Sequence, residues 1–129
     1  MKFLQLTSVM LLALIATSTQ AQGSCVLPAA DGGDEEPSPP SIVGVIAKIR
    51  PGEIWVKTGT SKPFVRVAVR GSTQISTVYG GGIEESSLRQ GQHTLIWLEH
   101  CQAPGRAPKT AAVVQICSLA AEPCPGAAS

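Results

Sequence analysis

Short runs of β-branched residues with a period of two, separated by Gly, Pro and Ser, constrain this chain most. In the clearest run, Val65, Val67 and Val69 alternate with Arg66 and Arg70. Successive side chains of a strand point to opposite faces of a sheet, so this run has one buried and one exposed face. The pattern predicts an all-β domain.

Five strands are predicted on this basis, at residues 42–50, 53–57, 64–70, 94–101 and 111–117. Pro51-Gly52 forms a turn after the first strand, and residues 58–62 turn the chain into the third. Gly80-Gly81-Gly82 is interpreted as a flexible loop, because no strand, lysine or helix stands at the offsets of a phosphate cradle. Residues 83–88 suit one or two helical turns. The predicted architecture is an all-β domain of five strands with a short helical turn.

Pairing of the first three strands places apolar residues opposite each other. Arg50 is expected to pair with Glu53 across the first turn, and Lys57 with Phe64 across the second. The rows that follow are Ile49 with Ile54, Ala47 with Val56, Ile54 with Val67, and Val56 with Val65. A type II Pro-Gly turn fits a two-residue hairpin poorly, so a bulge is expected to shift the first register while leaving each residue on its face.

The opposite face of these strands is predicted to carry a basic and aromatic row, Lys48, Trp55 and Arg66, with Ile46, Lys57 and Phe64 beside it. The candidate ligand-binding residues are therefore Lys48, Trp55, Lys57, Phe64 and Arg66. The alternative is that Trp55 only covers the stems of Lys48 and Arg66, in cation–π contacts of about 0.5 to 1 kcal/mol each at an exposed site.

Both ends of the chain differ from this middle part. Lys2, the apolar run at residues 9–16 and Thr19-Gln20-Ala21 predict a signal peptide at 1–21, with a run shorter than the roughly 18 residues of a membrane span. Residues 22–40 are predicted to be an acidic, Pro-rich linker, 41–118 the barrel and 119–129 a flexible tail. The protein is expected to be periplasmic or secreted. Lipidation at Cys25 is the less favoured alternative, because no aliphatic residue stands three positions before it.

Charge is divided unevenly along the chain, although the net charge is only +1. Residues 41–117 hold nine Lys or Arg against four Glu, whereas the linker holds Asp31, Asp34, Glu35 and Glu36. The net charge is thus about +5 for residues 41–117 and −4 for the linker. The asymmetry serves either solubility or anion binding, and in the second case the linker is expected to compete for the same basic residues.

Four cysteines follow the predicted cleavage site: Cys25, Cys101, Cys117 and Cys124. An even number in an exported chain, without a Cys-x-x-Cys pair, favours disulfides over a zinc site, and three connectivities are open. Cys101 and Cys117 would end successive antiparallel strands about 20 Å apart, too far for a bridge. This argues against one of the three connectivities, and of the two that stay open we prefer Cys25 with Cys101 and Cys117 with Cys124.

In its order of motifs the chain resembles a bacterial family of small exported OB-like barrels classed as a domain of unknown function. The motifs are Gly44-Val45-Ile46, Ile54-Trp55-Val56, Val65-Arg66-Val67, Thr73-Gln74-Ile75, Leu88-Arg89-Gln90-Gly91-Gln92 and Ala112-Val113-Val114-Gln115-Ile116. The resemblance covers residues 43–118 and departs from the pattern at Thr94, Cys101 and Cys117. It implies a barrel fold and no established activity.

Catalysis and metal binding are not expected from these residues, and no cofactor is predicted. His93 and His100 would face opposite sides of one strand, and Glu84 and Glu85 are interpreted as solvated charges. The domain is also similar to small periplasmic copper-binding barrels, which hold Cu(I) with His, Met and Trp. Here Met1 and Met10 leave with the signal peptide, so a metal-binding barrel is the least favoured alternative.

The function expected from the sequence is that of an exported, non-catalytic binding module. Its ligand would be an anionic glycan or an envelope protein, held on the outer face of the second and third strands, a surface that OB-type barrels commonly use. Nucleic acid is less favoured, because export removes the protein from most of it. The alternative is a structural accessory module that packs against another envelope protein.

Overall fold

The computed structural model describes residues 24–29 and 32–125 of the chain. The predicted signal peptide at 1–21 and the last four residues of the predicted tail lie outside this part. Within the described ranges, no helix is long and apolar enough to cross a membrane.

The described chain forms six strands and two short 3₁₀ turns. They are β1 (Ile42–Arg50), β2 (Glu53–Lys57), β3 (Val65–Ala68), β4 (Gln74–Thr77), η1 (Glu85–Ser87), β5 (His93–Leu98), η2 (Glu99–Cys101) and β6 (Lys109–Ile116). The five predicted strands are present, and η1 lies in the predicted helical segment. The strand predicted at 94–101 is too long, because its last three residues form η2. β4 is an additional strand that the periodicity did not predict.

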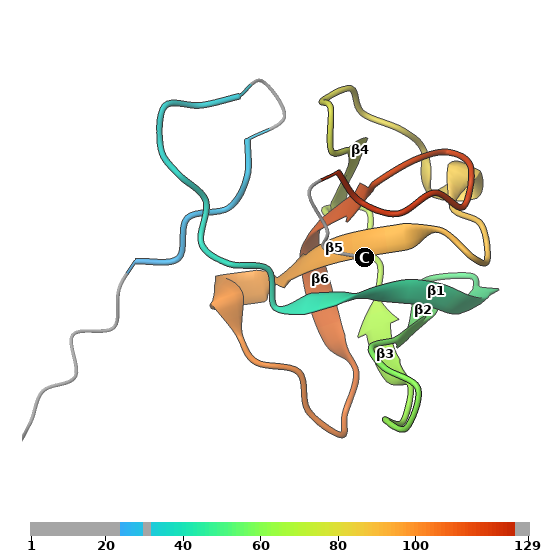
Figure 1. The fold of residues 1–129 in the computed structure, drawn as a ribbon. Helices are drawn as coiled ribbons and strands as arrows, with labels where there is room; N and C mark the ends of the chain where they lie inside the picture. Colours follow the sequence, from blue (N-terminus) through green and yellow to red (C-terminus); the bar gives the residue numbers. More distant parts are fainter. Residues whose placement is uncertain (1–23, 30–31, 126–129) are drawn as a thin grey trace, which may run out of the picture.

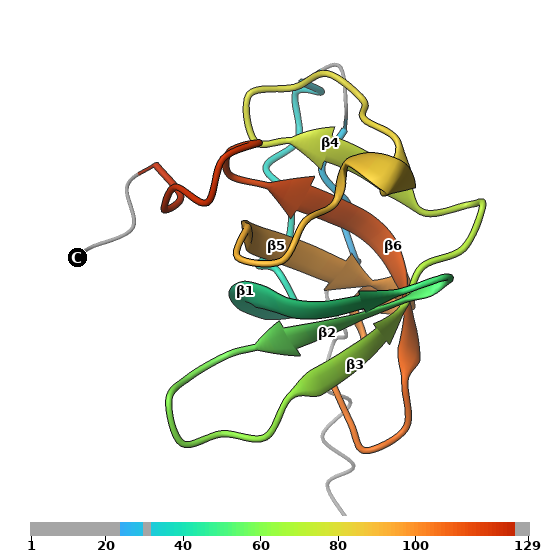
Figure 2. The same cartoon turned by 90° about the vertical axis from the view of Figure 1, so that its right-hand side faces the viewer.

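Pairing closes five of these strands into a small barrel (Figures 1 and 2). The sheet order is β3-β2-β1-β5-β6-β4, and a further pairing of β3 with β6 closes the ring. The β3–β6 pairing is parallel, whereas the other ring pairings are antiparallel. β4 pairs in parallel with the second half of β6, outside the ring. These pairings confirm the predicted all-β, OB-like barrel.

β1 contains the expected bulge, but the expectation that every residue stays on its predicted face is wrong. Near the turn the pairing is as predicted, Arg50 with Glu53 and Ile49 with Ile54, and Gly52 has the positive φ of 74° that a type II turn requires. Beyond Lys48 the register shifts at Ala47, so Val56 pairs with Ile46. One extra residue reverses the alternation for the rest of the strand. Ile46, predicted on the outer face, is therefore fully buried in the core.

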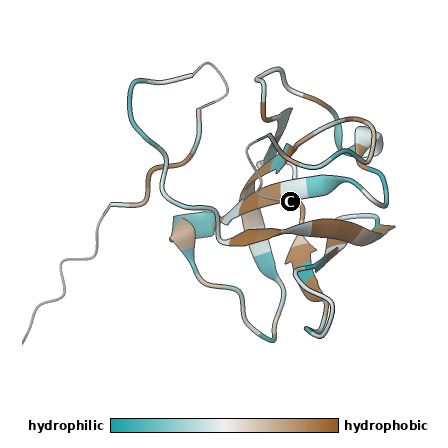
Figure 3. Ribbon diagram, viewed as in Figure 1, coloured by the Kyte–Doolittle hydropathy of each residue, from teal (hydrophilic) through white to brown (hydrophobic). Residues whose placement is uncertain are grey.

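The core is built from the inward side chains of all five ring strands, and Figure 3 shows apolar residues concentrated on these strands. Thr94 and Gln92 are polar but buried. The Thr94 hydroxyl donates a hydrogen bond to the Gln115 carbonyl (2.9 Å). The Gln92 amide oxygen accepts one from the Arg89 backbone N–H (2.7 Å), and its amide nitrogen donates to the carbonyls of Ser87 and Leu119. Both residues are thus satisfied, as buried polar groups must be.

The acidic, Pro-rich segment has no helix or strand in its described residues, yet it is joined to the barrel at several points. The Ser38 N–H donates to the Val26 carbonyl (2.8 Å), which closes the segment into a loop. The Trp97 indole N–H donates to the Ser38 carbonyl (2.6 Å). Trp97 lies between the inward residues Ile96 and Leu98 and so points away from the core, but it is only 4% exposed. The segment therefore packs over one outer part of β5.

Two disulfides attach the described segments on either side of the barrel to it, and they have the preferred connectivity. Cys25 is bonded to Cys101, and Cys117 is bonded to Cys124. The first attaches the acidic segment to η2 after β5, and the second holds the tail beside the end of β6. All four cysteines are thereby used, which fits an oxidising compartment.

Candidate binding site on β2 and β3

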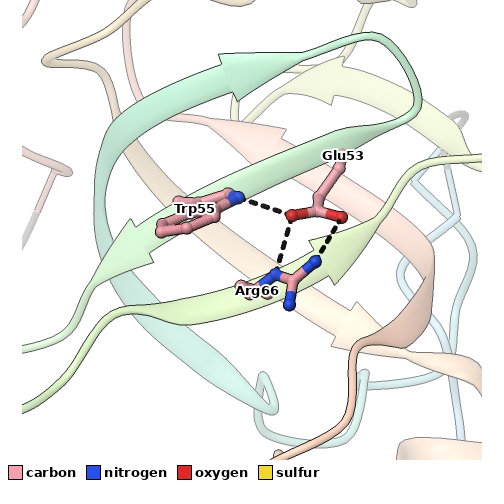
Figure 4. Close-up of polar contacts among 3 residues, drawn as sticks. All are labelled: Glu53, Trp55 and Arg66. Atoms are coloured by element: carbon pink, nitrogen blue, oxygen red, sulfur yellow. Dashed lines mark hydrogen bonds and ion pairs between the residues drawn. The ribbon is translucent and has the colours of Figure 1, made fainter.

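The outer face of β2 and β3 is organised by Glu53, Trp55 and Arg66 (Figure 4). Glu53 and Trp55 lie two residues apart on β2, so both point outward, and Trp55 is the cross-strand partner of Arg66 on β3. The Trp55 indole N–H donates a hydrogen bond to Glu53 Oε1 (2.5 Å). Arg66 donates from Nε to Oε1 (2.8 Å) and from Nη2 to Oε2 (3.2 Å) of the same carboxylate. The bidentate pairing orients the guanidinium and the indole together.

Three cations surround the Trp55 ring. Lys48 Nζ lies 4.8 Å from the ring centroid, Arg66 Cζ 5.3 Å and Arg50 Cζ 5.9 Å. The Phe64 ring lies 6.4 Å from that of Trp55, tilted by 50°. All of these distances fall within the usual ranges of cation–π and aromatic pairs. We call Lys48, Arg50, Glu53, Trp55, Phe64 and Arg66 the basic aromatic patch.

Four of the five predicted ligand-binding residues thus gather in this patch, whereas Lys57 stands apart. Lys57 is exposed at the end of β2, where it pairs with Val45, and its side chain makes no hydrogen bond or ion pair within the described residues. Sequence reasoning missed Glu53 and Arg50. Alternation could have found both. Glu53 lies two residues from Trp55 on β2, and Arg50 lies two residues from Lys48 on β1, so each shares the outward face of its neighbour.

A hollow of about 500 Å³ lies next to the patch. It is lined by residues 63–66 of β3 and its approach and by Pro104, Gly105 and Arg106 of the β5–β6 loop. The Lys109 ammonium donates a hydrogen bond to the Ala103 carbonyl (2.5 Å), which braces this loop against the start of β6. Arg66 and Arg106, forty positions apart in sequence, therefore share one concave surface.

The histidines lie elsewhere. His93 begins β5, whereas His100 lies in η2 with a positive φ of 56° and not on a strand as predicted. Among the described residues no group of three or more His, Cys, Asp or Glu side chains is placed to hold a metal ion.

A comparison of the chain with known protein families, curated proteins and solved structures found no match.

The geometry lowers the pKa of the Glu53 carboxyl, chiefly through the hydrogen bonds from Arg66, with a smaller contribution from the Trp55 indole, and Glu53 in turn raises the pKa of Arg66. A carboxyl whose pKa is lower in the folded state stabilises the fold above its unfolded pKa, and this contribution is lost as the pH falls through the folded pKa. We therefore expect the patch to hold its arrangement at neutral pH and to loosen only below the usual range of a glutamate. Carboxyl-detected NMR of Glu53 measures this pKa.

The matched variant for this titration is Arg66→Gln, which removes the guanidinium and leaves an uncharged amide nitrogen at the position of Nε. It is expected to raise the pKa of Glu53 toward its ordinary value. An unchanged Glu53 pKa in Arg66→Gln would contradict the role assigned to the ion pair.

Proposed function

We propose that the protein is an exported, non-catalytic binding module whose basic aromatic patch recognises an anionic partner, either an acidic glycan or an envelope protein. The observation that carries the proposal is the gathering of Lys48, Arg50 and Arg66 around one outward-facing Trp ring. Glu53 is the only carboxylate paired with them among the described residues. The patch thus keeps an excess of positive charge beside an aromatic surface, a combination suited to anionic ligands with apolar faces.

Preorganisation supports this function. The Arg66 side chain is 47% exposed, yet two hydrogen bonds to Glu53 hold its guanidinium in one orientation. Phe64 is 52% exposed on the same surface. Side chains already held in place lose less conformational freedom when a ligand binds, which improves affinity. We further propose a periplasmic or secreted location, which the two disulfides support.

The acidic segment lies on another side of the barrel. Its described part contacts β5 through Trp97, and Figures 1 and 2 place it beside β4 and β5, away from β2 and β3. Among the described residues the one ion pair is that of Arg66 with Glu53, so Asp34, Glu35 and Glu36 form none with the patch. Competition by this segment would act through the long-range field, which salt screens over about 10 Å at 0.1 M.

Retention on a heparin or alginate column tests the proposal. The mature chain is expected to bind at low ionic strength and to elute as salt rises, and the double variant Trp55→Ala/Arg66→Glu is expected to lose retention while remaining folded. The control Gln74→Glu/Gln90→Glu makes the same charge change at exposed positions outside the patch and should be retained nearly as well as the wild type. Neutralising the acidic segment with Asp34→Asn/Glu35→Gln/Glu36→Gln should delay elution slightly.

Two outcomes would contradict the proposal. Equal loss of retention in the control and in the patch variant would mean that only net charge matters. Absence of retention for every variant at low ionic strength would favour the accessory module that packs against another envelope protein.

A further inference from the structure

The barrel is incompletely closed between β3 and β6. The parallel ladder that joins them has only two residue pairs, Val67 with Lys109 and Ala68 with Thr110. Among the described residues, β3 has before Val67 a partner strand on its β2 side but none on its other edge. The sequence explains the gap, because Pro108 immediately precedes β6 and Pro104 lies in the same loop. Proline has no N–H to donate to a ladder, so β6 cannot extend upstream to cover β3.

The backbone of β3 directs hydrogen-bonding groups into this gap. The Val69 N–H donates to the Gly52 carbonyl (3.0 Å), so the backbone groups of odd-numbered residues here point toward β2. Since these groups alternate in an antiparallel pair, those of Phe64 and Arg66 point toward the opposite edge. Within the described residues Phe64 makes no backbone hydrogen bond. An unpaired strand edge of this kind is a template for another chain.

The gap coincides with the hollow of about 500 Å³ that residues 63–66 share with Pro104, Gly105 and Arg106. Of the described residues that line it, Arg66 and Arg106 are cationic and none carries a carboxylate. Arg66 is held by Glu53, whereas Arg106 makes no hydrogen bond or ion pair to any described residue. Charge complementarity therefore points to an acidic occupant.

We propose that this gap binds an extended acidic peptide segment of a partner protein, which adds as a strand to the free edge of β3. This rests on the proposed function and chooses the protein over the glycan as partner. Strand addition gains affinity from main-chain hydrogen bonds and specificity from alternate side chains. Here the amides of Phe64 and Arg66 would make the main-chain hydrogen bonds. The Arg106 side chain would pair with carboxylates of the incoming strand. A polysaccharide has no amide ladder with which to pair.

Binding of a fluorescein-labelled hexaglutamate peptide to the full mature chain, measured by fluorescence anisotropy at low salt, tests this inference. A hexaglutamate methylated at every second backbone nitrogen keeps one hydrogen-bonding edge and should bind within about twofold of the unmodified peptide. A fully N-methylated peptide has the same charge but no N–H, and it should bind at least about tenfold more weakly. On binding, the amide protons of Phe64 and Arg66 should exchange more slowly with solvent.

Arg106→Glu should weaken hexaglutamate binding by about tenfold or more, whereas Gln74→Glu/Gln90→Glu, with the same charge change, should alter it by less than about threefold. Equal affinity for the unmodified and the fully N-methylated peptide would overturn strand addition.

Oligomeric alginate, a polyuronate without amides, separates this inference from the proposed function. If alginate binds the patch and hexaglutamate does not bind, the strand addition is wrong and the binding module stands. If neither probe binds, both proposals fail.

Discussion

Replacing Ile54 with aspartate is expected to abolish the folded state of the barrel. Ile54 lies in the middle of β2, is 1% exposed, and pairs with Val67 on β3 inside the core cluster. Removing a large aliphatic side chain from a core costs about 2–5 kcal/mol. The carboxylate adds the cost of burying a charge without a partner. The sum approaches or exceeds the roughly 5–15 kcal/mol that stabilises a typical domain. Near-UV circular dichroism and urea unfolding measure the loss.

The matched control is Lys57→Asp, which introduces the same residue at an exposed end of the same strand. It is expected to change the free energy of unfolding by no more than about 0.5 kcal/mol. A wild-type unfolding transition in Ile54→Asp would show that this face of β2 is not the core.

Aspartate substitutions in β1 test the position of its bulge. Ile46→Asp should be as damaging as Ile54→Asp, because the shift at Ala47 turns Ile46 inward. Ala47→Asp, at the neighbouring half-buried position, should be much milder. A regular β1 without the bulge would give the opposite order.

Removing the Cys25–Cys101 disulfide is expected to destabilise the protein by about 4.5 kcal/mol, and removing Cys117–Cys124 by about 2.5 kcal/mol. The difference follows from the sequence separations of 76 and 7 residues, because a longer closed loop restricts the unfolded chain more. Paired Cys→Ser variants unfolded in guanidinium chloride without reductant measure both values. Equal losses, or the reverse order, would contradict the loop-closure explanation.

Loss of the Cys25–Cys101 disulfide should also increase the solvent exposure of Trp97. The indole is covered by the acidic segment and donates to the Ser38 carbonyl, so release of that segment exposes it to water. The Cys25→Ser/Cys101→Ser variant should therefore show red-shifted tryptophan emission before unfolding. Trp55 lies outside this contact and is the other tryptophan of the chain. The experiment is therefore done in a Trp55→Phe variant, in which the emission comes from Trp97 alone. An unshifted spectrum would mean that the hydrogen bonds alone keep the segment in place.

Local pattern predicted much of the barrel. The alternation in β2 and β3 was enough to predict their pairing, Ile54 with Val67 and Val56 with Val65. This worked because the side-chain period of a strand is two, and one buried face strongly selects the register. The spacing of the cysteines argued against a bridge between Cys101 and Cys117, because strand length limits which sulfurs can meet, and the structure pairs both with other partners. Most of the basic aromatic patch followed from the same alternation.

Other features depend on pairing between distant parts of the chain. The Pro-Gly turn predicted a bulge in β1 but not its position at Ala47 or the inward turn of Ile46, because these depend on how β1 pairs with its neighbours. β4 is a strand because it pairs with β6, nearly forty positions later, although only four residues form it. Trp97 is buried on an outward face because the acidic segment, which shows no periodicity, packs over it.

The candidate site likewise has features that the sequence predicts and features that depend on the tertiary structure. The sequence by itself determined which residues of β2 and β3 point outward, because alternation along a single strand is a local property. Only the tertiary structure decided that Glu53 orients Trp55 and Arg66 together, and that Arg106 and Phe64 line one hollow. These relations depend on the closure of β3 onto β6 through two residue pairs, a contact between strands about forty positions apart, which no local pattern specifies.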